Sequence, residues 1–374
     1  MLDGGGARAA YQVGLLRGLA RRHPDLRLPM ITGVSAGAIN ATFLAAHQGP
    51  FQQAVDDLGR MWADLTVEQV FRVDARSLLT HVWRWGLGLV SGGRLVGPPL
   101  LGMVDTSPLR RTLETAFESA RGAEIPGIAR NIAEGRLTGL AIITSSYTTG
   151  LTVAWVQGRN IADWERPFRM SRQCVMTADH VMASAALPLF FPAVTLDGAW
   201  YGDGGIRLVT PLSPAVHLGA RRILAFSTRY GRRGDEAARP QVSAYPPPAQ
   251  IAGQLLNAIF LDDHDRDAQN LVRLNLLLED LPEDRRRGLR VIDLVFIRPS
   301  QDIGRLAAQY EPRLPGPLRH MLGGIGTRHA KSSDLLSLLM FHPDYLKRLM
   351  EIGEADFEAR ADDIAALLAG EQAP

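Results

Sequence analysis

The sequence contains a single cysteine, Cys174, among its 374 residues. One cysteine excludes an intramolecular disulfide and any zinc site built from several cysteines. Lysine is almost as scarce, because only Lys331 and Lys347 occur and arginine supplies nearly all of the basic residues. A Walker-type phosphate loop, a Schiff-base lysine or a kinase-type lysine therefore has almost no place in this chain.

Long apolar runs and a strong excess of charge are also missing. No apolar run reaches the ~18 residues that a membrane-spanning helix needs, and Met1-Leu2-Asp3 does not open a signal peptide. The 41 basic and 39 acidic residues give a net charge of +2, which excludes a polyanion binder that works by bulk charge. We therefore expect a cytoplasmic enzyme that needs no metal or cofactor and binds no nucleic acid.

Apolar residues make up 46% of the chain, enough for a large buried core. Helical spacing indicates helices at 7–22, 35–47, 51–65 and 107–121, and apolar runs indicate strands at 28–32, 138–147, 151–157 and 222–228. This alternation predicts an α/β protein with a mostly parallel central sheet that helices cover on both faces.

The chain divides into three regions by composition. We expect an α/β domain at 1–230 and a surface linker, rich in charge and proline, at 231–248. Residues 249–374 form a mainly helical C-terminal region, with helical patterns at 249–279 and 343–369 and one further strand near 290–298.

The first candidate site is the run Gly4-Gly5-Gly6-Ala7-Arg8-Ala9, which opens a predicted helix. It satisfies the dinucleotide-binding pattern G-x-G-x-x-G/A. Consecutive glycines can turn their backbone N–H groups toward one point, and the following helix adds the positive end of its dipole. Such a loop accepts a bound phosphate or a transient oxyanion equally well.

The second candidate is Gly33-Val34-Ser35-Ala36-Gly37, a G-x-S-x-G string between a predicted strand and a predicted helix. This context places Ser35 on a tight turn at the carboxyl end of a strand. The flanking Gly33 and Gly37 give the turn its room, and the helix N-terminus favours developing negative charge. The alternative is that Ser35 only caps its helix.

A serine nucleophile needs a base, and a carboxylate suits this sequence better than a histidine. A standard α/β-hydrolase has several strands before its nucleophile, whereas only 34 residues precede Ser35, and the later histidines have no catalytic context. Asp203 in Gly202-Asp203-Gly204-Gly205 ends a predicted strand, with glycines that permit close approach of another backbone. Asp197, in the Asp197-Gly198 dipeptide, is interpreted as a turn former.

In this order, the motifs resemble those of the patatin-like phospholipase family: a D-G-G-G-x-R loop, G-x-S-x-G and D-G-G. The intervening Ala183-Ser184-Ala185-Ala186-Leu187-Pro188 and Phe190-Phe191-Pro192 also resemble the family's A-S-x-A-x-P and F-P stretches. The resemblance covers roughly residues 2–230, and three ordered motifs are far more specific than one. It implies a three-layer α/β/α catalytic domain that hydrolyses acyl esters of lipids without a metal.

Carried over residue by residue, the resemblance makes Ser35 the nucleophile and Asp203 the base of a Ser–Asp dyad. It assigns Gly4, Gly5 and Gly6, together with Arg8, to the oxyanion region. Two features depart from the family pattern. Ala9 replaces the usual glycine after the basic residue, and only Met1-Leu2-Asp3 precede the loop, so the first strand is either very short or begins upstream.

We therefore expect a serine acyl-ester hydrolase of the phospholipase A, lysophospholipase or esterase type, which works through an acyl-enzyme and contacts the membrane surface peripherally. One alternative is a Rossmann-type NAD(P)-binding oxidoreductase. Its ribose-binding acid, about twenty residues after the glycine loop, would be Asp25, which precedes its strand rather than ending it. The other alternative is a catalytically silent protein that binds a lipid or a partner.

Residues 78–104, in an apolar insertion at about 76–105, contain no acid, two tryptophans and two prolines. They form either a buried insertion or a mobile apolar cover that admits acyl chains. Three weaker candidates are interpreted as structural. His180 and Cys174 are expected to be structural or core residues, and the acids of 262–267 a solvated helix face rather than a metal cluster.

Overall fold

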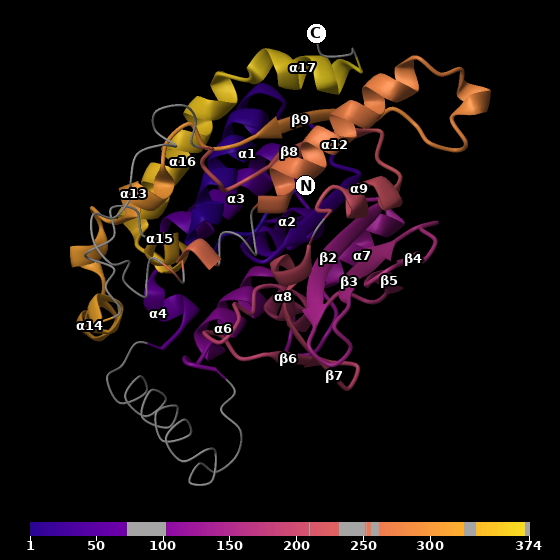
Figure 1. Cartoon of the computed structure of the whole chain (residues 1–374). Coiled ribbons are helices and arrows are strands. Elements are labelled where there is room, and N and C mark those ends of the chain that lie inside the picture. The colour runs from indigo at the N-terminus through magenta and orange to yellow at the C-terminus, as the bar shows by residue number, and fades with distance from the viewer. Residues whose placement is uncertain are drawn as a thin grey trace.

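The computed structural model describes residues 1–72, 102–208, 210–231, 251, 253–255, 262–324 and 334–370. The predicted linker, apart from residue 231, lies outside the described residues, and so does most of the apolar segment 78–104. Most of residues 249–261, where the helix predicted at 249–279 begins, also lie outside the described residues. Figure 1 shows the fold of the chain.

The centre of the molecule is a β-sheet in which β2 has neighbours on both edges. β2 runs parallel to β1 and antiparallel to β3 and β7, while β3 pairs with β5 in parallel. The strands are β1 (Met30–Val34), β2 (Gly139–Ser146), β3 (Thr152–Gly158), β4 (Glu165–Arg166), β5 (Arg169–Gln173), β6 (Val194–Leu196), β7 (Ala199–Asp203), β8 (Arg222–Phe226) and β9 (Asp293–Ile297).

The prediction of an α/β fold is confirmed, but the sheet is mixed rather than mostly parallel. The connection between β2 and β3, residues 147–151, is too short to cross over the sheet, and such a connection joins antiparallel strands. The hairpin of β6 and β7 adds a further antiparallel pair, because Asp197 and Gly198 adopt positive φ angles of 49° and 77° in a two-residue turn.

Leu2 connects the strands β8 and β9 to the rest of the sheet. It forms parallel bridges to Gly33 on one side and to Phe226 on the other, and its N–H donates a hydrogen bond to the Thr32 carbonyl at 2.8 Å. Leu2 therefore lies at the place in the sheet where the strand before the glycine loop is expected. Beyond it, β8 pairs with β9 in parallel.

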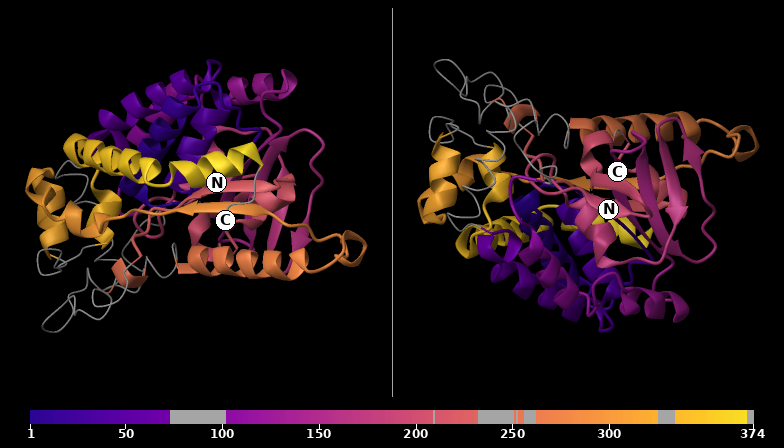
Figure 2. Two further views of the ribbon diagram at one scale, coloured as in Figure 1. Left: turned by 90° about the horizontal axis from the view of Figure 1, so that it is seen from above. Right: turned by 90° about the horizontal axis from the view of Figure 1, so that it is seen from below.

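Helices cover both faces of the sheet, as the three-layer prediction requires. Figure 2 shows α1–α3 and α16–α17 on one face and α12 on the other. The helices are α1 (Ala10–Arg22), α2 (Ala36–Ala46), α3 (Phe51–Ala63), α4 (Val67–Val70), α6 (Ser107–Ala116), α7 (Pro126–Ala133), α8 (Ala178–Ser184), α9 (Ser213–Leu218), α12 (Asp262–Glu279), α13 (Ile303–Ala307), α14 (Gly316–Gly324), α15 (Asp334–Leu339), α16 (Pro343–Glu358) and α17 (Ala361–Ala369). Short 3-10 turns are η1 (Gly6–Ala9), η2 (Gly204–Arg207), η3 (Glu283–Arg285) and η4 (Glu311–Arg313).

The C-terminal helices share one apolar core with the N-terminal ones. α1 and α16 approach closely enough that a side chain at Gly14 would overlap the Met350 carbonyl, and one at Gly353 would overlap the Tyr11 carbonyl. The buried Tyr11 hydroxyl donates a hydrogen bond to the Asp356 carboxylate at 2.9 Å. Two segments from opposite ends of the chain thus form one helix pair.

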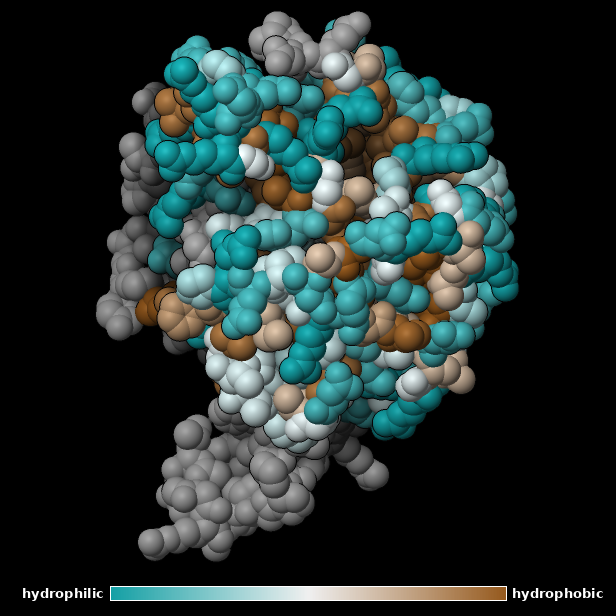
Figure 3. Space-filling view, turned by 90° about the vertical axis from the view of Figure 1, so that its right-hand side faces the viewer, coloured by the Kyte–Doolittle hydropathy of each residue, from teal (hydrophilic) through white to brown (hydrophobic). Residues whose placement is uncertain are grey.

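The surface carries hydrophobic residues mixed with hydrophilic ones, as Figure 3 shows for the face that includes the right-hand side of Figure 1. Exposed large apolar side chains occur near the sheet, at Phe168, Leu189 and Trp200, and on α12, at Leu276 and Leu277. In the part of the chain that the structure describes, we find no helix with the length and hydrophobicity needed to cross a membrane.

Candidate active site

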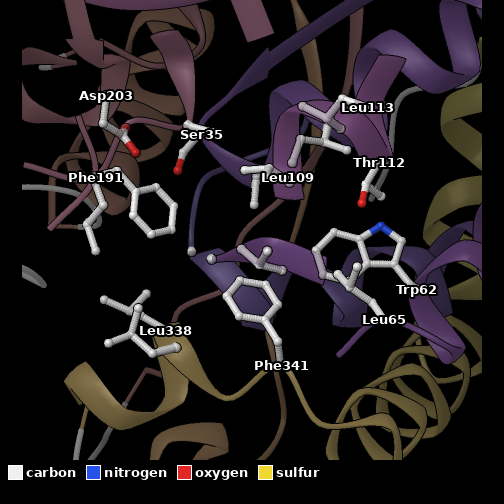
Figure 4. A pocket seen from close by; sticks show the side chains of 18 of the residues that line it. Ser35, Trp62, Leu65, Leu109, Thr112, Leu113, Phe191, Asp203, Leu338 and Phe341 are labelled. Carbon is white, nitrogen blue, oxygen red and sulfur yellow. The ribbon is translucent and has the colours of Figure 1, made fainter. Parts of the chain in front are cut away.

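Two strands that run in opposite directions meet on one edge of β2. β1 pairs with the first part of β2, ending where Val34 faces Ile143, and β7 pairs with its last part, ending where Asp203 faces Thr144. Ser35 follows directly on β1, so the geometry of the sheet brings it to Asp203. Figure 4 shows the Ser35 and Asp203 side chains next to each other, and interaction with the Ser35 hydroxyl lowers the pKa of the Asp203 carboxyl.

Ser35 lies on the tight strand-to-helix turn that the sequence predicts. Its φ of 55° and ψ of −130° are unusual for a residue with a side chain, a strain that costs on the order of 1–3 kcal/mol and is typical of functional positions. A side chain at Gly33 would overlap the Gly37 carbonyl, and one at Gly37 would overlap the Asp3 carbonyl. Within the described residues Ser35 makes no side-chain cap on α2, so the capping alternative is not realised.

The A-S-x-A-x-P stretch supports the backbone of both residues. The Ser35 N–H donates to Ser184 Oγ at 2.9 Å, and the Ser184 hydroxyl in turn donates to the Ile143 carbonyl at 2.6 Å. The Asp203 N–H donates to the Ala186 carbonyl at 3.1 Å. Ser184 is fully buried, and therefore its hydroxyl fixes the turn without contacting solvent.

Asp203 has a strongly shifted titration. Burial raises the pKa of its carboxyl from 3.8 to about 7, while hydrogen bonds from Ser35 and from the Gly205 N–H, at 2.9 Å, act in the opposite direction. The buried Asp3 adds a smaller like-charge contribution that raises this pKa further. A carboxyl that titrates near neutral pH is a competent proton acceptor for a hydroxyl.

The structure divides the residues expected in the oxyanion region into two groups. Gly5 and Gly6 line the same pocket as Ser35, and Gly5 has a φ of 142° that a residue with a side chain rarely adopts. Gly4 lies against the Ser35 side chain, but its N–H donates to Asp3 Oδ1 at 2.6 Å. Arg8 is buried behind the loop, where its guanidinium contacts Ser337 and Asp334.

An apolar pocket extends from Ser35 and Asp203. In Figure 4, Trp62 and Thr112 lie at the end of the pocket away from the two residues. Apart from Gly5, Gly6, Ser35, Thr112 and Asp203, all of the lining residues are apolar: Ala36, Ile39, Met61, Trp62, Leu65, Val70, Leu109, Leu113, Ala185, Leu187, Phe191, Leu338, Leu339 and Phe341. Such a lining suits an unbranched hydrocarbon chain and offers few partners to a polar ligand.

The structure gives the weaker sequence candidates structural surroundings. Asp197 is exposed in the β6–β7 turn. His180 completes a capping box with Thr177 on α8, and burial lowers its pKa to about 4, so it is neutral near pH 7. Cys174 packs against the core, and burial raises the pKa of its thiol to about 12. Asp265 pairs with Arg298 at 2.7 Å.

Sequence reasoning missed the C-terminal part of the site. Leu338, Leu339 and Phe341 line the pocket although they follow Ser35 by some three hundred residues, and no local pattern marks them. It also missed the hydrogen bond from the Ser35 N–H to Ser184. The motif around Ser184 is visible in the sequence, but this contact depends on how α8 packs on β2.

The chain was compared with family models, with curated proteins and with solved structures. The family described as Patatin-like phospholipase matches residues 1–216. No curated protein matches. Among solved structures, VipD from Legionella pneumophila is similar at 14% identity, with 93% of this chain and 66% of that chain covered and a TM-score of 0.36. The chain therefore spans just under two thirds of VipD, and a likeness this weak carries no information on function.

Proposed function

The chain belongs to the patatin-like phospholipase family, and on that premise we propose that it hydrolyses acyl esters of lipids with Ser35 and Asp203. Lipid acyl hydrolysis is the general activity of the family. The observation that carries the proposal is that the strained Ser35 and the buried Asp203 lie side by side at one end of an apolar pocket. A purely structural serine has no need of such a turn, such a partner and such a cavity together.

In the proposed reaction, Asp203 accepts the Ser35 proton as the Ser35 oxygen attacks the ester carbonyl. The carbonyl oxygen becomes an oxyanion, and the amides of Gly5 and Gly6, together with the N-terminus of α2, are the groups that would stabilise it. The Gly4 amide is a weaker choice, because it already donates to Asp3. Loss of one oxyanion donor costs on the order of 10²–10³ in rate.

Collapse of the tetrahedral intermediate expels the alcohol part of the lipid, which takes up the proton held by Asp203. The acyl group remains on the Ser35 oxygen as an ester. A water molecule then gives its proton to Asp203 and attacks this ester, so the fatty acid leaves and the Ser35 hydroxyl is restored. One carboxyl thus acts as base, acid, base and acid in turn.

The raised pKa of Asp203 is what makes a two-residue mechanism plausible chemically. A carboxylate with the ordinary pKa of 3.8 holds a proton too weakly to assist attack by a serine hydroxyl, whereas a pKa of about 7 improves the match near neutral pH. The apolar pocket supports the same assignment, because it would hold the acyl chain while the polar part of the lipid faces away.

The oxidoreductase alternative fits less well. A pyrophosphate would have to lie against the glycine loop, but Gly5 and Gly6 line a mostly apolar pocket, which offers few partners to a charged diphosphate. Asp25 lies in the loop before β1, not at the end of a strand.

A fluorophosphonate probe with a long alkyl chain tests the proposal. We expect it to label the wild type on Ser35 and to leave Ser35→Ala unlabelled, with slow labelling of Asp203→Asn. Asp197→Asn is the matched control, since this acid is exposed in a turn six residues away. Equal labelling of Ser35→Ala would refute the nucleophile. A thermal shift with NAD and no labelling would favour the oxidoreductase. The absence of both labelling and a thermal shift would favour a silent binder.

A further inference from the structure

One wall of the pocket comes from outside the part of the chain that the family matches. The match ends at residue 216, whereas Leu338 and Leu339 belong to α15 and Phe341 follows it. All three side chains are buried and line the pocket together with Ser35. Figure 4 shows Leu338 and Phe341 across the pocket from Leu109.

Arg8 ties this wall to the glycine loop. Its Nε donates to Ser337 Oγ at 2.7 Å, and its Nη2 donates to Asp334 Oδ1 at 2.8 Å and to the Asp334 carbonyl at 3.0 Å. The Arg8 side chain is 3% exposed and that of Asp334 is 18% exposed, so this ion pair is largely desolvated. The three contacts are therefore made to the first and fourth residues of α15.

Gly6 provides a second attachment between the loop and α15. Its φ is 54°, and a side chain at this position would overlap the Leu338 carbonyl. The backbone of the loop and the backbone of α15 are therefore in direct contact. A shift of α15 would move both the pocket wall and the surroundings of the Gly5 and Gly6 amides.

We propose that Leu338, Leu339 and Phe341 set the acyl-chain preference of the enzyme and that Arg8 is the positioning residue that holds them in place. The inference rests on the proposed hydrolase function, since it names the wall that the acyl chain meets. It also gives Arg8 a role other than oxyanion stabilisation, because Arg8 contacts α15 and does not line the pocket.

Two substitutions of opposite sense test the wall. Phe341→Ala should enlarge the pocket and Leu339→Phe should narrow it. The test compares kcat/KM of each variant and the wild type on p-nitrophenyl esters from butanoate to palmitate. A missing or extra methylene contact in an apolar pocket changes discrimination by about tenfold or more. We expect the palmitate-to-butanoate ratio to rise by about tenfold in Phe341→Ala and to fall by about tenfold in Leu339→Phe.

Leu336→Ala is the matched control. Leu336 lies on the same helix and is fully buried, but it does not line the pocket. This variant should lower the melting temperature and leave the ratio unchanged. If all three variants lose activity on all esters in parallel with stability, the wall has only a structural role and the inference is wrong.

A double-mutant cycle tests the positioning role of Arg8. Arg8→Gln and Asp334→Asn should each reduce the chain-length preference, and the double variant should be no worse than either, because the two residues act through one contact. Full additivity of the two changes in preference would contradict the assignment.

A binding measurement keeps the inference independent of catalysis. In the Ser35→Ala protein, calorimetric titration with palmitate and octanoate should show the same opposite shifts for Phe341→Ala and Leu339→Phe. If the wild type hydrolyses no ester but these affinities shift, the proposed function fails and the wall assignment stands. If esters are hydrolysed and neither the ratio nor the affinities move, only the inference fails.

Discussion

Val34 and Asp203 face consecutive residues of one strand, Ile143 and Thr144, although their own strands run in opposite directions. Ser35, the proposed nucleophile, follows Val34 directly, and Asp203 is the proposed base. The spacing between Ser35 and Asp203 is therefore set by the hydrogen-bond ladders of β2, which makes it more rigid than a spacing set by two loops.

Removal of either member of the pair should abolish hydrolysis. We expect Ser35→Ala and Asp203→Asn each to lower kcat by several orders of magnitude with a folded protein, and the double variant to be little worse, because the two residues act as a unit. Steady-state kinetics on a soluble ester measure this. An Asp203→Asn protein as active as the wild type would remove Asp203 from the mechanism, and Asp197→Asn serves as the control that should stay active.

The activity should depend on pH through Asp203. Burial raises the pKa of this carboxyl to about 7, and only the ionised form accepts the Ser35 proton. We expect kcat/KM to rise with pH and to level off above about 7, with one ionisation on the acidic limb. His180, whose pKa burial lowers to about 4, contributes no second step near neutral pH. A profile that is flat from pH 5 to pH 9 would contradict this assignment.

Stability should show the opposite trend with pH. The raised pKa means that folded Asp203 binds its proton more tightly than the unfolded chain, whose value is 3.8. This contribution to the free energy of unfolding is fully present below pH 3.8 and is lost as pH rises through about 7. The melting temperature of Asp203→Asn, relative to wild type, should therefore increase over this range. A constant difference would show that the folded-state pKa is unshifted.

Ser184 should matter for turnover more than for substrate binding. Ser184→Ala leaves the buried Ser35 N–H without its acceptor, a loss that costs about 1–3 kcal/mol and allows the turn to relax. We expect kcat to fall roughly tenfold with KM nearly unchanged. Ser171 is the matched control, because its Oγ also accepts a backbone N–H, from Trp164 at 2.9 Å, and neither residue lines the pocket. Equal losses of kcat in Ser171→Ala and Ser184→Ala would remove any special role for Ser184.

The turn at Ser35 could be predicted from the sequence because its chemistry is local. Gly33 and Gly37 mark the close approach, and the strand and helix on either side set the direction of the serine. Element boundaries depend on tertiary packing as well as on local pattern: the strand predicted at 28–32 lies at Met30–Val34, and the helix predicted at 343–369 is divided into α16 and α17. The short strands β4 and β5 have no apolar alternation, and they were not anticipated.

Pairing between distant segments could not be read from local patterns. The strand lengths before and after β2 do not reveal that β1 and β7 share one edge of it and run in opposite directions. Likewise Arg8 was assigned to the oxyanion region by resemblance, whereas its partners Asp334 and Ser337 lie more than three hundred residues away. Contacts of that range depend on the tertiary fold alone.

The pairing of α1 with α16 bears on when the enzyme becomes active during its synthesis. Tyr11 and Asp356 are 345 residues apart, and the glycine loop is joined directly to the helix that carries Tyr11. During translation the N-terminal helix is made long before its partner, and contacts of such sequence separation form late. We expect ribosome-bound chains stalled before residue 334 to resist fluorophosphonate labelling, and chains with 334–358 fully emerged to react. The proposed activity would then begin only after the residues that form α15 and α16 have left the ribosome.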